Sequence, residues 1–440
     1  MSTTSPKKRV ALTTLGCKVN QFESAAFLSS LAEREAEVVD FAGPAEVYIV
    51  NTCAVTARAA QQSRQMIRRA LKANPAARLV VTGCYAQIAS QEILDLVDQP
   101  LCIVGNGFKD KLVEIALADD HCDLEMFMSD IGRRKEICPL TVRRFGDRTR
   151  AYLKIQDGCN SFCSYCVVPF TRGRSRSLAP EKVVEQARVF AAEGYRELVI
   201  TGIHTGTYGQ DLQPATDLVA LLRRLAAECP LRYRISSLDP GEITPELLEL
   251  LVAEPHLLPH LHIPLQSGDD QVLARMNRRY TAAGFGDLLS RIRHRLPDAA
   301  IGADVMAGFP GEDEAAFRNT YNLLAGLPVT YLHVFPYSKR PGTVAARMEG
   351  QVASGVKNER VALLRELDQR KRREFYTSQL GQVRSVLAEP GRRGKRLGGF
   401  TDNYVPVRFA APAELVNTVV RVRLDEVVED GVRATLMAEG

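Results

Sequence analysis

The stretch Asp157–Arg176, DGCNSFCSYCVVPFTRGRSR, carries three cysteines, Cys159, Cys163 and Cys166. The Cys-x3-Cys-x2-Cys spacing places three soft thiolate ligands on one short loop, and such ligands suit iron–sulfur clusters. Three thiolates can hold three irons of a cubane and leave the fourth iron open to a molecule that offers an amine and a carboxylate. A structural zinc site is the alternative, but zinc motifs usually pair one Cys-x2-Cys with a second such pair, and none follows here.

The bulk composition is that of an ordinary soluble globular protein. The chain has 440 residues, of which 45% are hydrophobic and 25% charged, and this length predicts about two to four domains. Its first residues, MSTTSPKKRV, lack the apolar run of a signal peptide, and no stretch of about 18 apolar residues predicts a membrane span. Without an export signal, the 10 cysteines are expected to be reduced thiols or metal ligands. We therefore expect a cytoplasmic protein without a membrane partner, and the net charge of +5 permits an anionic partner without requiring one.

The first third of the chain alternates short apolar runs with helical patterns, which predicts a parallel α/β domain. Its strands are predicted at Val10–Thr14, Val47–Asn51, Leu79–Thr82 and Leu101–Val104. Cys17, Cys53 and Cys84 each follow the carboxyl end of one of these strands. Because such ends converge on one crevice, we expect the three thiols to meet there and to hold a second iron–sulfur cluster. Buried free cysteines are common, but that explains one such placement better than three. From 119 to 147 the pattern dissolves, and we predict a linker.

The middle of the chain repeats strand–helix units, which predicts a partial (β/α)6 barrel with its ligand site at the carboxyl ends of the strands. The strands are predicted at Ala151–Gln156, Leu198–Thr201, Arg232–Ser236, His260–Leu265, Ile301–Met306 and Tyr331–Phe335. Small or hydrogen-bonding residues follow these strands: Gly202, His204, Gly206, Ser236, Gln266 and Arg278. Small residues leave room for a ligand, and an arginine can grip a carboxylate with two hydrogen bonds. His260 and His262 share one face of a strand, where a packed or hydrogen-bonded pair is favoured over a metal site.

The last part of the chain changes to a period-two pattern after a long charged helix predicted at Asn358–Tyr376. Strands are predicted at Val383–Leu387, Leu397–Thr401, Val405–Phe409, Thr418–Leu424 and Arg433–Ala438. Short strands at this spacing predict a small β-barrel of the oligonucleotide-binding kind. A surface for phosphate contacts and base stacking is predicted at Arg392, Arg393, Lys395, Arg396, Phe400 and Tyr404. The alternative is a solvated loop with core aromatics.

Taken together, these blocks resemble the radical-SAM methylthiotransferase family, in which SAM is S-adenosylmethionine. The matching stretches are Leu15–Gln21, Asn51–Cys53, Thr82–Cys84 and Asp157–Arg176. The period-two block resembles the TRAM domain that ends most tRNA-directed members. The resemblance implies an N-terminal methylthiotransferase domain at 1–137, a radical-SAM core at 138–375 and an RNA-binding β domain at 376–440.

The resemblance also implies two 4Fe–4S clusters. One is expected at the cysteines of the Asp157–Arg176 loop, and the auxiliary one at Cys17, Cys53 and Cys84. SAM would bind with Gly202 and Gly206 beside its methionyl amine. Its remaining polar groups would meet Ser236, Gln266 and Arg278, and His204 would line the site.

The family's reaction follows as an expectation. One SAM would be cleaved to a 5′-deoxyadenosyl radical that takes a hydrogen from C2 of an adenine in the tRNA anticodon stem-loop. A second SAM would methylate a sulfur held at the auxiliary cluster, and the CH3–S group would go to that carbon. The target base must be unstacked, which costs little in a single-stranded loop. An electron donor such as flavodoxin or ferredoxin is expected as a partner.

The residues after Cys17, Lys18-Val19-Asn20-Gln21, resemble the branch that acts on N6-threonylcarbamoyladenosine. A basic residue is expected to bind the carboxylate of that substrate, either Lys18 or an arginine of the Arg172–Arg176 run. Methylthiolation of isopentenyladenosine in tRNA, or of a ribosomal-protein aspartate, is the alternative within the family. Outside the catalytic class, a non-catalytic iron–sulfur RNA-binding protein and an iron–sulfur electron carrier remain as alternatives.

Overall fold

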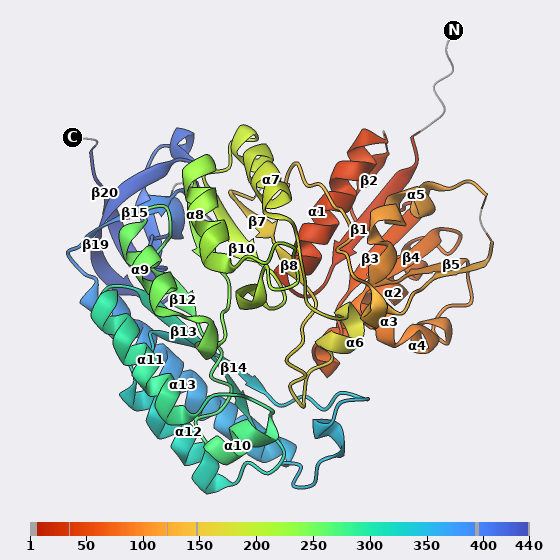
Figure 1. The fold of residues 1–440 in the computed structure, drawn as a ribbon. Helices are drawn as coiled ribbons and strands as arrows, with labels where there is room; N and C mark the ends of the chain where they lie inside the picture. The colour runs from red at the N-terminus through yellow and green to blue at the C-terminus, as the bar shows by residue number, and fades with distance from the viewer. Residues whose placement is uncertain (1–6, 35, 121, 147, 392–395, 439–440) are drawn as a thin grey trace.

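The computed structural model describes residues 7–34, 36–120, 122–146, 148–391 and 396–438. Within these residues, the N-terminal part is a parallel sheet with the strand order β2-β1-β3-β4-β5-β6 (Figure 1). Its strands are β1 Arg9–Thr14, β2 Glu37–Val39, β3 Val47–Thr52, β4 Arg78–Gly83, β5 Leu101–Val104 and β6 Leu124–Phe127. Its helices are α1 Lys18–Glu33, α2 Ala57–Ala73, α3 Cys84–Ile88, α4 Ser90–Leu94 and α5 Leu112–Leu117.

Both faces of this sheet are covered, which is why β3 and β4 are buried along their whole length. Phe27 and Leu31 of α1 pack with Leu112 of α5 on one face, and Ile67 of α2 packs on the other. The prediction of a linker over 119–147 is wrong at Leu124–Phe127, where strand β6 forms. That strand pairs with β5 at the sheet edge, and because Leu124 is half exposed there, its sequence lacks the apolar run of a buried strand.

The middle of the chain is the predicted partial barrel. Its strands are β7 Arg150–Lys154, β10 Glu197–Thr201, β11 Arg232–Ile235, β12 His260–His262, β13 Ala300–Ala307 and β14 Tyr331–Pro336. They pair in parallel as β11-β10-β7 and β12-β13-β14, and a parallel bridge between Tyr233 and Leu257 connects the two groups. The outer helices are α7 Pro180–Ala192, α8 Leu218–Glu228, α9 Pro245–Ala253, α11 Ala282–Arg295 and α12 Glu314–Gly326. Helix α1 of the N-terminal part packs on β7 at one barrel edge.

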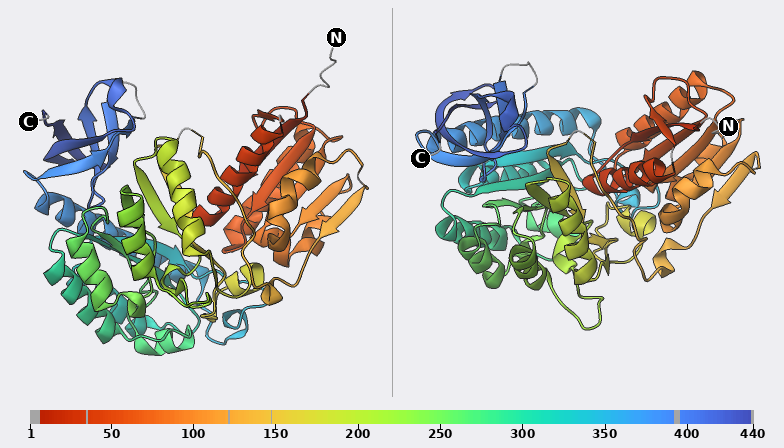
Figure 2. Two further views of the ribbon diagram at one scale, coloured as in Figure 1. Left: turned by 45° about the horizontal axis from the view of Figure 1, so that its top comes forward. Right: turned by 90° about the horizontal axis from the view of Figure 1, so that it is seen from above.

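The long helix α13, Ser354–Ser378, leads into a curled, mostly antiparallel sheet. Its strands are β15 Val383–Leu387, β16 Glu389–Pro390, β17 Arg396–Phe400, β18 Pro406–Ala410, β19 Val419–Val428 and β20 Gly431–Leu436. The order is β15-β19-β20-β18-β17-β16, with β18 and β20 parallel. A bridge between Val386 and Thr401 connects β15, at one end of the sheet, with the residue that follows β17, so the sheet curls back on itself as a half-barrel requires. Figure 2 shows this sheet and the N-terminal sheet on opposite sides of the barrel.

The turn Thr401–Tyr404 of this sheet, the floor turn, packs against the amino ends of the barrel strands. Arg234 Nη2 donates to Thr401 O at 3.1 Å, and the Tyr404 ring stacks on His260 with 4.0 Å between centroids. Arg234 also pairs with Glu197, whose side chain is fully buried. These contacts fix the C-terminal sheet against the barrel.

The prediction that Phe400 and Tyr404 belong to an RNA-stacking surface is therefore wrong. Tyr404 lies between His260 and Phe400, and the Phe400 ring faces the Arg150 guanidinium at 5.3 Å. Both rings pack in the interface between the C-terminal sheet and the barrel, as the alternative of core aromatics predicted. Arg396 is exposed at the start of β17, whereas Arg392, Arg393 and Lys395 lie outside the described residues. Among the described helices, none combines the length and apolar composition that a membrane span requires.

Candidate cluster and substrate site

The Cys159–Cys166 loop runs from β8 (Gln156–Asp157) to α6 (Val168–Arg172). Gly158 begins the loop at φ +75°, and a Cβ there would lie 2.0 Å from Arg174 O, so only glycine fits. Backbone N–H groups point at two of the sulfur atoms: Ser161 N lies 3.4 Å from Cys159 Sγ, and Val168 N lies 3.4 Å from Cys166 Sγ. Such donors favour a thiolate over a thiol.

Two basic side chains also approach the sulfur atoms of this loop. His204 Nδ1 lies 3.5 Å from Cys159 Sγ, and Arg278 Nη1 lies 3.3 Å from Cys163 Sγ. Burial alone would raise the pKa of Cys159, but the hydrogen bond and charge of His204, together with the hydrogen bonds of Ser161, lower it. Cys166 lacks such a partner among the described residues, and burial raises its pKa to about 12. A thiol in that setting becomes a thiolate when a metal replaces its proton.

The second set of cysteines meets where the parallel strands end. Cys17 precedes α1, Cys53 follows β3, and Cys84 begins α3. Gly83 has φ +95°, and a Cβ there would lie 2.3 Å from Thr52 O, so the loops carrying Cys53 and Cys84 touch through backbone. Burial and the neighbouring Cys84 raise the pKa of Cys53 to about 11. Cys17 is exposed by surface area, yet the protein atoms that surround it raise the pKa of its thiol too.

The spacing of the sulfur atoms counts against a single zinc ion. Tetrahedral zinc with Zn–S bonds of about 2.3 Å brings its sulfur atoms within about 3.8 Å of one another. Among the described residues, neither cysteine set has its three sulfur atoms within 4.8 Å of one another. Thiolate donors at wider separation suit a cubane, in which each cysteine binds a different iron.

The residues predicted at SAM line the carboxyl end of the barrel. Gly202 and His204 follow β10, where Gln156 Oε1 accepts from His204 N at 2.8 Å. A Cβ on Gly206 would lie 2.1 Å from Glu242 Oε2. Glycine is thus needed for close packing against Gln156 and Glu242, two polar side chains that sequence reasoning did not identify.

The remaining residues predicted to bind SAM differ in whether their polar atoms already have partners in the protein. Gln266 lies at φ +65°, and its buried Oε1 has no hydrogen-bond partner among the described residues. An unpaired buried acceptor is costly, so this oxygen fits a ligand amine or hydroxyl. Ser236 Oγ accepts from Lys18 Nζ at 3.3 Å. Arg278 is already paired with Asp239 at 2.6 Å, so its predicted grip on a SAM carboxylate stays a prediction.

A buried charge cluster joins the two cysteine-bearing regions, and sequence reasoning missed it. Arg172 Nη1 lies 2.8 Å from Glu23 Oε1 and 3.1 Å from Asp157 Oδ2. Lys109 and Lys154 complete the cluster around Glu23. Within the Arg172–Arg176 run, Arg172 and Arg176 are buried in structural contacts, which leaves neither free for a substrate carboxylate. Arg174 is exposed, so an arginine of this run as the carboxylate ligand stays a prediction for that residue alone.

Asn20 extends this cluster to the second cysteine set. Its amide Nδ2 donates to Leu15 O at 2.7 Å and to Thr52 O at 3.0 Å, and its Oδ1 accepts from Arg172 Nη2 at 2.6 Å. The backbone on either side of Cys17 and directly before Cys53 is thereby tied to α6, the helix that follows Cys166. No sequence pattern pairs these positions, because the contacts span about 150 residues.

The barrel interior also holds a cluster formed by His262, Asp304 and His333. His262 Nε2 lies 2.8 Å from Asp304 Oδ1, and His333 Nδ1 lies 3.3 Å from the same oxygen. Tyr331 OH lies 3.1 Å from His262 Nδ1 and 2.7 Å from His260 Nε2. The two histidines of β12 are thus bridged by one tyrosine hydroxyl, as the hydrogen-bonded interpretation predicted.

Lys18 reaches this interior from the N-terminal sheet. Burial and the Arg234 guanidinium lower the pKa of Lys18, whereas nearby Cys17 and Asp304 act in the opposite direction. The Lys18 Nζ donates to Ser236 Oγ, at the carboxyl end of β11, at 3.3 Å.

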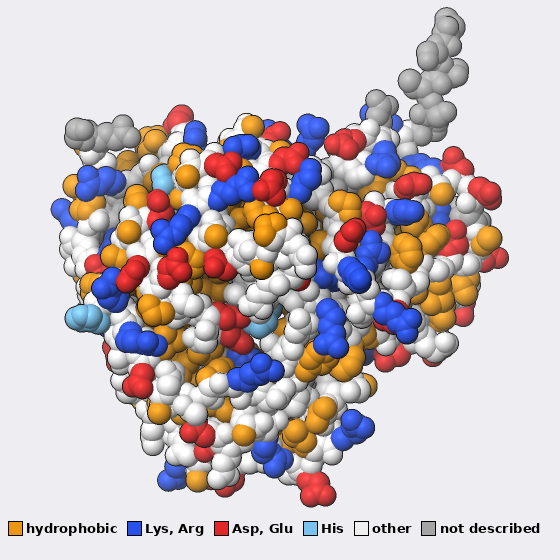
Figure 3. All heavy atoms as spheres, viewed as in Figure 1, with side chains coloured by type: hydrophobic (Ala, Val, Ile, Leu, Met, Phe, Trp, Pro, Cys, Tyr) orange, Lys and Arg blue, Asp and Glu red, His pale blue; other side chains and the backbone are white. Residues whose placement is uncertain are grey.

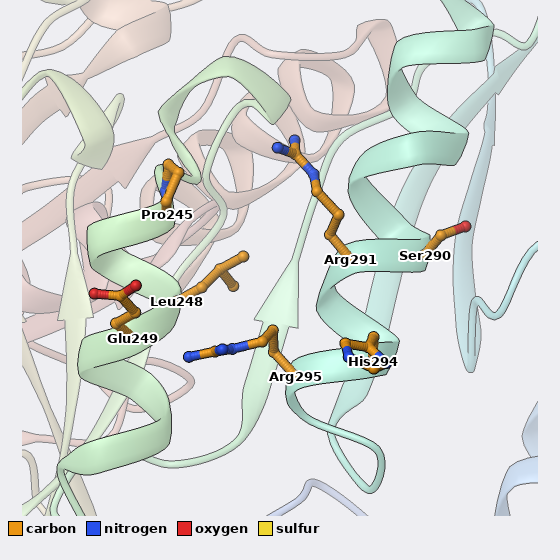
Figure 4. A pocket seen from close by; sticks show the side chains of 7 residues that line it. All are labelled: Pro245, Leu248, Glu249, Ser290, Arg291, His294 and Arg295. Atoms are coloured by element: carbon orange, nitrogen blue, oxygen red, sulfur yellow. The ribbon is translucent and has the colours of Figure 1, made fainter.

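A cavity of about 460 Å³ lies between α9 and α11 and is lined by Pro245, Leu248, Glu249, Ser290, Arg291, His294 and Arg295 (Figure 4). None of these residues belongs to the predicted site. On the face drawn in Figure 3, acidic and basic side chains are interspersed, so no single-sign patch marks an RNA footprint there.

Comparison with known proteins finds two family models and several relatives that match this chain. Residues 9–105 match the model described as Uncharacterized protein family UPF0004, and residues 153–324 match that of the Radical SAM superfamily. The threonylcarbamoyladenosine tRNA methylthiotransferase MtaB of Bacillus subtilis is 41% identical over 424 residues, covering 94% of this chain and 93% of the relative. The Aquifex aeolicus protein of the same name is 38% identical, covering 94% and 99%. The tRNA-2-methylthio-N(6)-dimethylallyladenosine synthase of Maricaulis maris is 32% identical, covering 99% and 98%.

Solved structures show the same fold at low identity. The radical S-adenosylmethionine methyltransferase TsrM of Kitasatospora setae has a TM-score of 0.55 and 17% identity, with 77% of each chain covered. The cobalamin-dependent radical enzyme OxsB has a TM-score of 0.51 and 11% identity, covering 84% of this chain and 57% of that one. At these identities the likeness concerns the fold alone.

Proposed function

Because this chain belongs to the family of radical-SAM tRNA methylthiotransferases, we propose that it adds CH3–S to C2 of N6-threonylcarbamoyladenosine next to the tRNA anticodon. The relatives of 41% and 38% identity carry that substrate in their names, and the relative of 32% identity is named for the dimethylallyl substrate. We assign the threonylcarbamoyl substrate because the two relatives of higher identity carry it in their names.

One observation supports the proposal most directly. The two cysteine sets lie on separate sheets, yet a shared buried cluster around Arg172 holds their loops together. A reaction that opens a C–H bond at one cluster and delivers sulfur from another needs both groups near one substrate carbon. Positioning of this kind is the protein's main contribution when cofactors carry the chemistry.

The residues present fit the cofactors that this family uses. Two 4Fe–4S clusters and SAM, when bound, supply the radical and sulfur-transfer chemistry. We assign the SAM cluster to Cys159, Cys163 and Cys166. The auxiliary cluster is assigned to Cys17, Cys53 and Cys84. SAM itself is assigned to Gly202, His204, Gly206, Ser236, Gln266 and Arg278.

The rim of the Cys159 loop suits a single-stranded RNA partner. Phe162 and Phe170 are exposed there, and Arg174 is exposed with its guanidinium 4.7 Å from the Phe162 ring centroid. Exposed aromatic rings beside a cation can stack unpaired bases and contact phosphates. We assign domains to 1–137, 138–375 and 376–440, with the tRNA anticodon stem-loop as substrate. A small electron-transfer protein such as flavodoxin or ferredoxin would be the reductant, and the location would be cytoplasmic.

The test is a paired assay with two anticodon stem-loops, one bearing threonylcarbamoyladenosine and one isopentenyladenosine. Anaerobically reconstituted protein, SAM and dithionite should give 2-methylthio product on the first. Mass spectrometry of tRNA nucleosides from a strain that lacks the protein should show loss of the same nucleoside. Product on the isopentenyl stem-loop alone would overturn the substrate, and SAM cleavage without product on either would move the assignment to a ribosomal-protein aspartate.

A further inference from the structure

Three side chains that commonly bind metal ions converge inside the barrel: His262, Asp304 and His333. They come from β12, β13 and β14, which are neighbours in one sheet. Asp304 is the register partner of His333, and His262 pairs with Gly302, two residues before Asp304. Because alternate residues of a strand share one face, all three side chains project from the same face of this sheet.

The donor atoms of these residues have the spacing of metal ligands. His262 Nε2 lies 2.8 Å from Asp304 Oδ1, and His333 Nδ1 lies 3.3 Å from the same oxygen. One donor atom from each residue falls within 4.8 Å of the other two. Metal–nitrogen and metal–oxygen bonds of about 2.0–2.2 Å place neighbouring ligand atoms roughly 2.8–3.6 Å apart in octahedral or tetrahedral geometry. Both separations from the Asp304 oxygen fall in that range.

Hydrogen bonding alone explains the position of His262 better than that of His333. The contact of 2.8 Å has the length of an ordinary N–H···O hydrogen bond, whereas 3.3 Å lies beyond the usual range of about 2.7–3.2 Å. The His333 side chain is 56% exposed, and a long hydrogen bond in that setting contributes little because water can replace it. A shared metal ion would give both imidazoles a reason to face one carboxylate.

The imidazole of His262 is held from behind by a hydroxyl group. Its Nδ1 lies 3.1 Å from Tyr331 OH, which also lies 2.7 Å from His260 Nε2. A polar partner on the other ring nitrogen fixes the orientation of a metal-binding histidine. The Tyr331 ring fits there because residue 302 is glycine: a Cβ on Gly302 would lie 2.1 Å from Tyr331 Cζ. The sheet thus supports the orientation that a metal ligand needs.

One side of this set of ligands is open. The exposed fraction of the side chain rises from 8% for His262 to 22% for Asp304 and 56% for His333. Asp304 Oδ2 has no hydrogen-bond partner among the described residues. An ion can therefore enter from the side of His333 and reach both oxygens of the carboxylate.

We propose that His262, Asp304 and His333 bind one divalent transition-metal ion, through His262 Nε2, the Asp304 carboxylate and His333 Nδ1. Two imidazoles and one carboxylate suit Zn²⁺ or Fe²⁺, and three protein ligands leave positions for water or for an oxygen atom of another ligand. His260 is not a ligand, since its Nε2 faces Tyr331. The inference stands apart from the proposed function, because the site needs neither tRNA nor SAM.

The test measures zinc binding by the cluster-loaded full chain after passage over a chelating resin. At micromolar free Zn²⁺, the wild type should bind one zinc ion per chain without losing iron, as counted by plasma mass spectrometry after gel filtration. His333→Ala should lose this zinc and keep its iron, because the side chain is more than half exposed. His294→Ala, at an exposed histidine on α11, is the matched control and should bind zinc as the wild type does.

Two further measurements separate a metal site from a hydrogen-bonded cluster. Tyr331→Phe keeps the ring but removes the hydroxyl behind His262, and it should weaken zinc binding about 10- to 100-fold. X-ray absorption at the zinc edge should show nitrogen and oxygen neighbours at about 2.0–2.2 Å, with the outer scattering of imidazole. A sulfur neighbour at about 2.3 Å would place the zinc at a cysteine and overturn the proposal. Unchanged zinc binding by His333→Ala, or binding only at millimolar Zn²⁺, would overturn it as well.

Discussion

Arg172 and Glu23 form a fully buried ion pair between α6 and α1, with 2.8 Å between Nη1 and Oε1 and both side chains 1% exposed. Removing one member of such a pair leaves an uncompensated buried charge, which costs about 3–5 kcal/mol. The pair also bridges the loops that carry the two cysteine sets, so its loss affects fold and site together.

Glu23→Gln should destabilise the apo-protein, and the loss should depend on pH. Burial alone would raise the pKa of Glu23, but Arg172, Lys109 and Lys154 together lower it from the usual 4.5 to about 2. The stabilisation from the charged form is present above pH 4.5 and is lost as the pH falls toward 2. Urea unfolding should therefore show a gap of about 3–5 kcal/mol at pH 7 that narrows between pH 4.5 and 2. Glu185→Gln, which removes an exposed pair with Lys182, should show no such gap. A gap that stays constant with pH would contradict the assignment.

Gly83→Ala should remove the auxiliary cluster while sparing the other. A Cβ at this position would lie 2.3 Å from Thr52 O and push apart the loops of Cys53 and Cys84. Wild-type protein reconstituted anaerobically should hold about eight iron atoms, four per cluster, and the variant about four. Gly194→Ala is the matched control, since Gly194 also has a positive φ of +89° but nothing within 4 Å of its Cβ position. Unchanged iron in Gly83→Ala would remove the second cluster from this location.

Tyr404→Ala should loosen the C-terminal sheet from the barrel. The ring stacks on His260 at 4.0 Å and on Phe400 at 4.6 Å, and loss of both contacts should cost about 1–3 kcal/mol. Limited proteolysis should then cut the variant between α13 and β15, where the wild type should resist. Arg408→Ala changes an exposed pair with Asp430 on the same sheet and should leave the cleavage pattern as it is. Resistance of the tyrosine variant would mean that the floor turn does not anchor the sheet.

Much of the fold is predictable because local patterns determine it. Strands β3, β4, β10 and β13 are buried apolar runs, and helix α7 begins at Pro180 as expected. The positions of Cys17, Cys53 and Cys84 after parallel strands likewise follow from the sequence. Strand β6 was missed because an exposed edge strand needs no apolar run.

The other prediction errors concern residues that are far apart in the sequence and meet only in the folded protein. Arg172 reads as one member of a basic run, and only the fold brings Glu23 to it. Phe400 ends β17 and Tyr404 lies in the floor turn that follows it, so both were interpreted as surface aromatics. Nothing in the local sequence indicates that this turn packs against the barrel floor. The interior cluster of His262, Asp304 and His333 combines three separate strands, so its members share no spacing that a sequence could show.

The floor turn limits how freely parts of this protein can be exchanged. Its contacts with Arg234 and His260 mean that the C-terminal sheet supplies the lower wall of the same barrel whose interior holds Asp304. A chimera that receives this sheet from a relative would need the matching barrel residues as well. Grafting the sheet alone would therefore leave Arg234 and His260 without these partners, and the barrel floor is where exchange of parts in this chain ends.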